Sequence, residues 1–148
     1  MSSTSRVPRP QPLLILGLAV LFTLVTLSVG AQPTKVVAEG EWTKKSFSVK
    51  GTWQLVERGG QHVVVLDDAF STKKAPDLKL FLSPRPLADV GNRNATDGSV
   101  LIAPLDSHKG AQEYVVPADT DLSQFKTLVI HCEKFSKLWA GSTLPAGR

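Results

Sequence analysis

Residues 51–66 read GTWQLVERGGQHVVVL. Apolar and polar side chains alternate over residues 51–56, an apolar run returns at residues 62–66, and Gly59-Gly60 lies between the two. Alternation with a period of two is typical of a half-buried strand, and paired glycines tolerate the positive φ angles of a tight turn. The stretch therefore predicts a β-hairpin, with Trp53 on its core face.

The rest of the chain extends this pattern. Residues 78–82 form an apolar strand bounded by proline turns, with Leu78, Leu80 and Leu82 expected to face the core. Three further strands are predicted at residues 100–102, 114–116 and 128–135. A long surface loop is expected at residues 87–99. The only helical turn predicted is at residues 119–125, so no amphipathic helix separates the strands. This arrangement predicts an all-β fold, a single antiparallel β-sandwich domain spanning residues 36–144.

Composition limits the domain count and the partners. The 148 residues are 42% hydrophobic and 20% charged, which fits one ordinary globular domain. The formal charge of +4 includes Arg6 and Arg9 near the N-terminus, so the remainder carries only +2. So small an excess gives no reason to expect a nucleic-acid partner.

The N-terminus predicts export. Arg6 and Arg9 precede an uncharged apolar run at residues 13–29, and Val29-Gly30-Ala31 supplies the small residues that a signal peptidase requires. Residues 1–31 are therefore interpreted as a signal peptide. Since 17 apolar residues also reach the lower limit of a membrane span, an uncleaved anchor at 13–29 is the alternative. Both interpretations place the domain outside the cytoplasm, either periplasmic, cell-surface or secreted, or anchored to the membrane.

Cys132 is the only cysteine, so the chain forms no internal disulfide. In a strand it shares a face with Ile130, while His131 points to the opposite face. Burial among apolar side chains gives an inert structural thiol. At the rim of a sandwich, with Lys134 or His131 favouring the thiolate, the same residue supports disulfide exchange or axial ligation of a metal centre. An intermolecular disulfide is a further alternative.

No metal site or hydrolytic triad is predicted. His131 and Cys132 are adjacent and cannot readily bind one ion, and the three histidines lack a ligand spacing. The histidines are expected to be exposed strand and loop residues. Asp106-Ser107-His108 contains triad residue types without a Gly-x-Ser-x-Gly elbow, and is interpreted as a polar turn.

Several motifs occur together in a fixed order. They are Ala75-Pro76-Asp77-Leu78 before the apolar strand, Gln112-x-Tyr114-x-x-Pro117, and Ile130-His131-Cys132-x-x-Phe135. The ordered set, over about residues 36–144, resembles the DM-thirteen domain, also called the electron-transfer DM domain.

The resemblance implies a β-sandwich of exported proteins that is often found beside haem-binding or redox modules. It also implies an electron-transfer role centred on the family's characteristic cysteine, which maps onto Cys132. The chain departs from the family pattern at His131, where an aromatic residue is common, at Ala75, where glycine is usual, and near Ser46-Phe47, where a histidine is missing. A histidine-dependent metal or haem site is therefore not expected here. No cofactor is evident in the chain, and any haem or other redox centre belongs to a partner.

Two hypotheses follow. In the first, Cys132 is the redox thiol of an exported module that exchanges electrons or a disulfide with a separate redox protein. In the second, the chain is a non-catalytic module that binds a protein, glycan or envelope component through loops such as residues 87–99, and Cys132 is structural. Both describe a carrier or a binder more than an enzyme in its own right.

Overall fold

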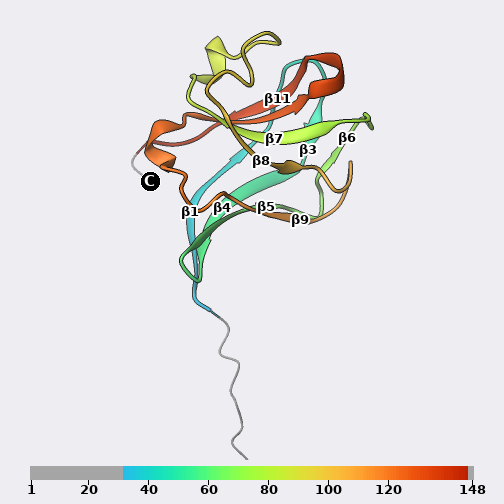
Figure 1. Cartoon of the computed structure of the whole chain (residues 1–148). Helices are drawn as coiled ribbons and strands as arrows, with labels where there is room; N and C mark the ends of the chain where they lie inside the picture. The colour runs from blue at the N-terminus through green and yellow to red at the C-terminus, as the bar shows by residue number, and fades with distance from the viewer. Residues whose placement is uncertain (1–31, 147–148) are drawn as a thin grey trace, which may run out of the picture. The chain divides into compact units, whose positions relative to one another are not determined.

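The computed structural model describes residues 32–146. These residues form two antiparallel sheets packed face to face (Figure 1), so the predicted all-β sandwich is confirmed. The predicted signal peptide or anchor, residues 1–31, lies outside the described residues. Within residues 32–146 we find no helix with the length and hydropathy that a membrane span requires.

One layer is a four-stranded sheet in the order β1-β4-β5-β9. Its strands are β1 (Thr34–Glu41), β4 (Thr52–Arg58), β5 (Gln61–Leu66) and β9 (Gln112–Val115). β4 and β5 are the predicted hairpin, and its turn residues Gly59 and Gly60 have φ angles of 57° and 76°. The positive φ angles explain why the turn contains two glycines.

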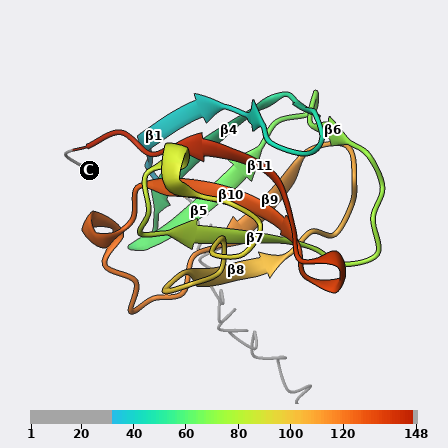
Figure 2. The same cartoon turned by 90° about the horizontal axis from the view of Figure 1, so that it is seen from above.

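The other layer is a five-stranded sheet in the order β2-β11-β10-β7-β8. Its strands are β2 (Thr43–Lys44), β11 (Lys137–Thr143), β10 (Thr127–Cys132), β7 (Leu78–Ser83) and β8 (Val100–Pro104). A two-stranded ribbon pairs β3 (Val49–Lys50) with β6 (Ser71–Thr72), and Figure 2 shows β6 at one end of the domain from above. The short 3₁₀ helices are η1 (Leu87–Asp89), η2 (Leu122–Gln124) and η3 (Glu133–Phe135).

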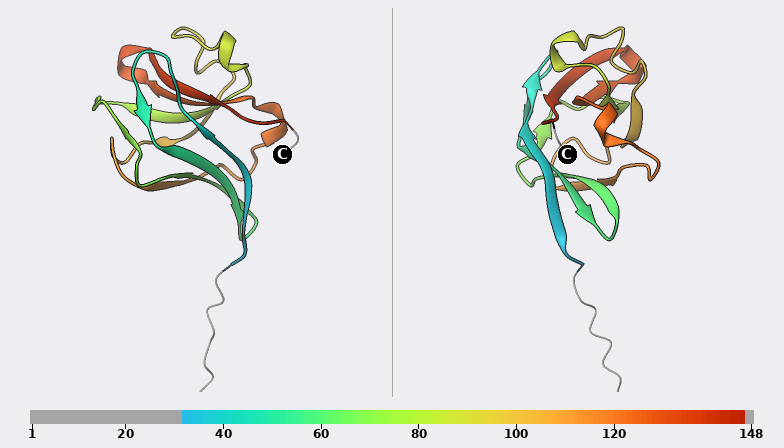
Figure 3. Two further views of the ribbon diagram at one scale, coloured as in Figure 1. Left: turned by 180° about the vertical axis from the view of Figure 1, so that it is seen from behind. Right: turned by 90° about the vertical axis from the view of Figure 1, so that its left-hand side faces the viewer.

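The main core lies between the two sheets (Figure 3). Leu78, Leu80 and Leu82 of β7 all belong to it, as the sequence alternation predicts, and Trp53 of β4 has no exposed surface. Removal of these side chains from water is the main source of stability for a domain without disulfides.

A second, smaller core covers the outer face of the five-stranded sheet. Its buried members are Phe81, Val90, Ala95, Val129 and Leu138. The segment predicted as a surface loop, residues 87–99, supplies two of them, so it folds back over the sheet as well as facing solvent. Asn92 holds it there, because its side-chain oxygen accepts a hydrogen bond of 2.8 Å from the backbone N–H of Leu138.

Some element boundaries differ from the sequence prediction. The predicted strand at residues 128–135 ends at Cys132, and residues 133–135 form η3, followed by Ser136 in the left-handed region at φ 46°. The helical turn predicted at residues 119–125 is limited to η2. β1 and β11 were not predicted, although β11 is a central strand of its sheet.

Candidate functional site

Cys132 is the last residue of β10 and has no exposed surface. It pairs with Leu78 of β7 on one side and Lys137 of β11 on the other. Its side chain belongs to the core between the sheets, together with that of Ile130, so the face predicted from strand alternation is the one observed. In the folded domain the thiol is therefore closed to solvent.

The chain reaches the surface directly after Cys132. The three residues of η3 are exposed, and the backbone N–H of Glu133 donates to the carbonyl of Asp77 at 3.1 Å. The Lys79 ammonium group forms ion pairs with the carboxylates of Glu133 and Asp77, the latter at 3.4 Å. The hydrogen bond to Glu133 raises the pKa of Lys79. These contacts fasten η3 to β7 next to the buried thiol.

His131 lies on the opposite face of β10, against the outer core. It is only 4% exposed, its ring meets Phe81 edge-on at 6.3 Å between centroids, and neither ring nitrogen has a hydrogen-bond partner in the structure. The prediction that the histidines are exposed is wrong for His131, because the 87–99 loop covers this face of the sheet. Burial lowers the pKa of His131, against the opposing effects of Asn92, Glu133 and Asp77.

The structure gathers no metal-ligand set within residues 32–146: no three His, Cys, Asp or Glu side chains are placed to hold an ion. Cys132 belongs to the core between the sheets, whereas His131 packs against Phe81 of the outer core. The Asp106-Ser107-His108 segment is a turn, in which the N–H of Ser107 donates to Gln112 Oε1 at 2.9 Å. That hydrogen bond gives the segment a structural role.

An aromatic groove lies at the same end of the sandwich as Cys132. It encloses about 230 Å³ and is lined by Phe47, Lys73, Lys74, Ala75, Pro76, Phe135, Lys137 and Trp139. Lys137 is the strand partner of Cys132, and Phe135 follows it in η3. We refer to this feature as the lysine groove. The groove could not be predicted from the sequence, because its residues come from three separate segments of the chain.

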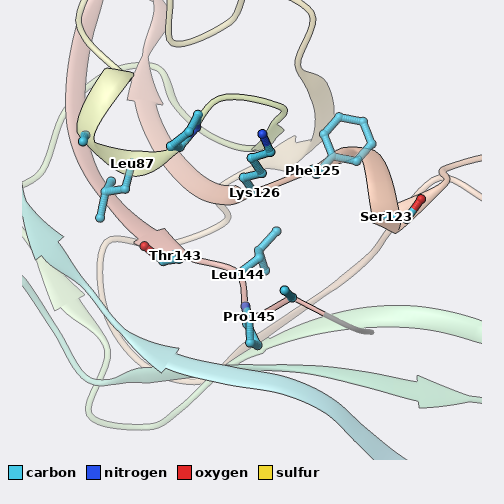
Figure 4. Close-up of a pocket in the computed structure, with 10 residues that line it drawn as sticks. Leu87, Ser123, Phe125, Lys126, Thr143, Leu144 and Pro145 are labelled. Carbon is cyan, nitrogen blue, oxygen red and sulfur yellow. The ribbon is translucent and has the colours of Figure 1, made fainter.

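A larger apolar cleft lies at the other end of the five-stranded sheet (Figure 4). It holds about 680 Å³, and its walls are Pro86, Leu87, Ala88, Ser123, Phe125, Lys126, Thr143, Leu144, Pro145 and Ala146. β10 runs from the cleft, at its Thr127 end, to Cys132 at its other end. Five residue steps of roughly 3.4 Å place the two about 17 Å apart. The cleft is therefore remote from the thiol.

The fold and the site together define a small antiparallel β-sandwich with one thiol enclosed at the end of a central strand. The family model described as Electron transfer DM13 matches residues 41–140, and the chain belongs to that family. The resemblance seen in the sequence motifs is thereby confirmed, and the match includes Cys132. No curated protein and no solved structure matches the chain.

Proposed function

We propose that this protein is an electron-transfer component that works outside the cytoplasm with a separate redox protein, and that Cys132 is its redox group. The observation that carries the proposal is membership of the Electron transfer DM13 family across the segment that contains the only cysteine. The location rests on the signal or anchor interpretation of residues 1–31.

One thiol limits the chemistry. The S–H bond of Cys132 and that of a partner thiol break, and a mixed disulfide forms between the two sulfur atoms. The two protons pass to water. The two electrons pass to redox centres carried by the partner, either one two-electron centre or two one-electron centres such as haems. Because sulfur must meet sulfur in this step, the buried thiol has to become accessible first.

The end of β10 offers a route for that opening. The 3₁₀ turn η3 has no buried side chain, and it is held to Asp77 and Lys79 by one backbone hydrogen bond and one ion pair. Exposed ion pairs contribute about 0–1 kcal/mol. Local opening of η3 and the last residues of β10 therefore costs less than global unfolding.

The absence of exposed surface on Cys132 favours a second candidate function. In that alternative the thiol is an inert core residue, and the domain is a binding module that acts through its surface alone. The two candidates differ in whether the folded domain ever presents the thiol.

The deciding experiment measures the rate at which a thiol reagent modifies the native protein in increasing, sub-denaturing urea, with Cys132→Ala as the blank. The redox proposal predicts modification through local opening, slower than in the unfolded chain by roughly 30- to 1,000-fold for an opening of about 2–4 kcal/mol. Its rate should depend weakly on urea, since little surface is exposed.

The opposite result is modification only through global unfolding. The logarithm of the modification rate would then rise with urea concentration with a slope set by the full equilibrium m-value. The free energy of opening derived from the rate would equal the global free energy of unfolding. That outcome would exclude Cys132 as a redox group under native conditions and leave the binding module.

A further inference from the structure

We propose that the lysine groove is a docking site for an acidic segment of a partner protein, which inserts one apolar side chain between the aromatic rings. This inference does not depend on a redox role for Cys132. It rests on the arrangement of three aromatic and three lysine side chains that the fold brings together, namely Phe47, Phe135, Trp139, Lys73, Lys74 and Lys137.

The floor of the groove is rigid and aromatic. Phe47 stacks on Trp139 with 3.9 Å between ring centroids, and its backbone N–H donates to the carbonyl of Trp139 at 3.1 Å. The indole N–H of Trp139 donates to Thr72 Oγ1 at 2.8 Å. Both rings are therefore fixed before any partner arrives, which reduces the entropy lost on binding.

Phe135 supplies an exposed wall. Four large apolar residues within 32–146 are exposed, and Phe135, at 59%, has the highest exposed fraction of them. It is also the only aromatic residue of the four. It stands on η3, at the same end of the molecule as β6 in Figure 2. An exposed aromatic ring beside a fixed aromatic floor is the kind of anchor point that dominates protein interfaces.

The charge around the groove is positive and unneutralised. Lys73, Lys74 and Lys137 make no ion pair within residues 32–146, whereas the neighbouring carboxylates of Asp77 and Glu133 are both occupied by Lys79. The Lys73 ammonium group lies 5.0 Å from the centroid of the Phe47 ring, where it caps the aromatic face. Three ammonium groups without a carboxylate partner, placed around an apolar floor, complement carboxylates that flank an apolar side chain.

The size of the groove selects the class of partner. Small-molecule and cofactor sites usually enclose about 300–1,000 Å³. The 230 Å³ of the lysine groove falls below that range and suits a single large side chain. A protein segment that carries such a side chain between acidic residues therefore fits better than a free cofactor.

The test uses protein purified after expression of the full-length chain, and a blocked pentapeptide with a central phenylalanine and two glutamates on each side. Binding is followed by the NMR resonance of the Trp139 indole N–H, with the indoles of Trp42 and Trp53 as checks on the fold. The peptide should shift the Trp139 resonance saturably. Affinity should fall with added salt, and fall by at least about fivefold when alanine replaces the central phenylalanine.

Variants assign the contacts. Replacing both Lys73 and Lys137 by glutamine should weaken binding by roughly four- to 25-fold, from about two- to fivefold for each exposed charge pair. Phe135→Ala should weaken it by about five- to tenfold with the fold intact, because the ring stands mostly in water. The matched control replaces Lys35 and Lys126, exposed lysines away from the groove, by glutamine and should leave affinity unchanged.

Three results in the peptide titrations overturn the proposal: no shift of the Trp139 resonance at millimolar peptide, equal binding of the alanine peptide, or equal weakening of binding by the control pair of substitutions. The last would reduce the effect to diffuse attraction between the peptide and any lysine. Concentration-dependent shifts of Trp139 without peptide would assign the groove to self-association and also overturn it.

Discussion

Replacing the Cys132 thiol by a hydroxyl should destabilise the domain more than deleting the thiol altogether. Cys132 has no exposed surface and sits in the apolar core between the sheets. Cys132→Ala removes one heavy atom and leaves a small void, which costs about 1 kcal/mol. Cys132→Ser keeps the shape but buries a hydroxyl among apolar groups, which costs roughly 2–3 kcal/mol in all.

The assay is equilibrium unfolding in urea, followed by tryptophan fluorescence, for the wild-type protein and both variants. The expected order of the free energy of unfolding is wild type, then alanine, then serine, with similar m-values. In thermal unfolding the alanine variant should lose about 4 °C in Tm and the serine variant about twice as much.

A serine variant as stable as the alanine variant, or more so, would refute the reasoning, because the site would then hold a polar partner or water. The expected order also decides the choice of redox control. Serine at position 132 would change stability and redox chemistry together, so alanine is the cleaner substitution.

Three further predictions concern the backbone and the buried imidazole. Gly51→Ala should lower the free energy of unfolding by about 2–4 kcal/mol, because Gly51 has φ 83° and a new Cβ would lie 2.6 Å from the Phe70 backbone nitrogen. Gly60→Ala, at φ 76° with no atom within 4 Å of the new Cβ, should lower it by only about 0.5–1 kcal/mol. Equal losses in urea unfolding would contradict the steric clash at Gly51. Ser136→Gly should stabilise the domain by about 0.5–1 kcal/mol by relieving the left-handed backbone at φ 46°, and a lower urea midpoint would argue against this. The pKa of His131 is lowered from 6.5 in the folded state, so the unfolded chain binds the proton first, and the free energy of unfolding should fall as the pH drops below about 6.5. His131→Phe should reduce this dependence of the free energy of unfolding on pH. An unchanged pH dependence would assign it to other groups.

Local patterns predicted the parts of the fold that depend on neighbouring residues. The paired glycines at 59–60 and the alternation on either side were enough for the β4–β5 hairpin, and the spacing of the three leucines of β7 placed them in the core. β11 was missed because Lys137–Thr143 contains Trp, Ala and Gly without a clear period. Its burial comes from its place between β2 and β10, which is a property of the whole sheet.

The candidate site shows the same division. Strand alternation put Cys132 and His131 on opposite faces, but it could not show what covers each face. His131 is buried because a loop some 40 residues earlier in the chain folds over it, held by Asn92. The lysine groove joins Phe47, Lys73 and Trp139, whose proximity depends entirely on the tertiary fold.

Both sheets are open, so each sheet has two edge strands at which another copy of the chain could pair. β1 and β9 border one sheet, and β2 and β8 border the other. Unpaired strand edges invite other chains to add to a sheet, and short strands, charges, bulges and prolines prevent this. β2 has only two residues, β8 ends in Pro104, Pro117 closely follows β9, and β1 carries charged residues and a bulge after Val36. Each border is thus protected against edge-to-edge aggregation, a safeguard that suits a domain without disulfide cross-links.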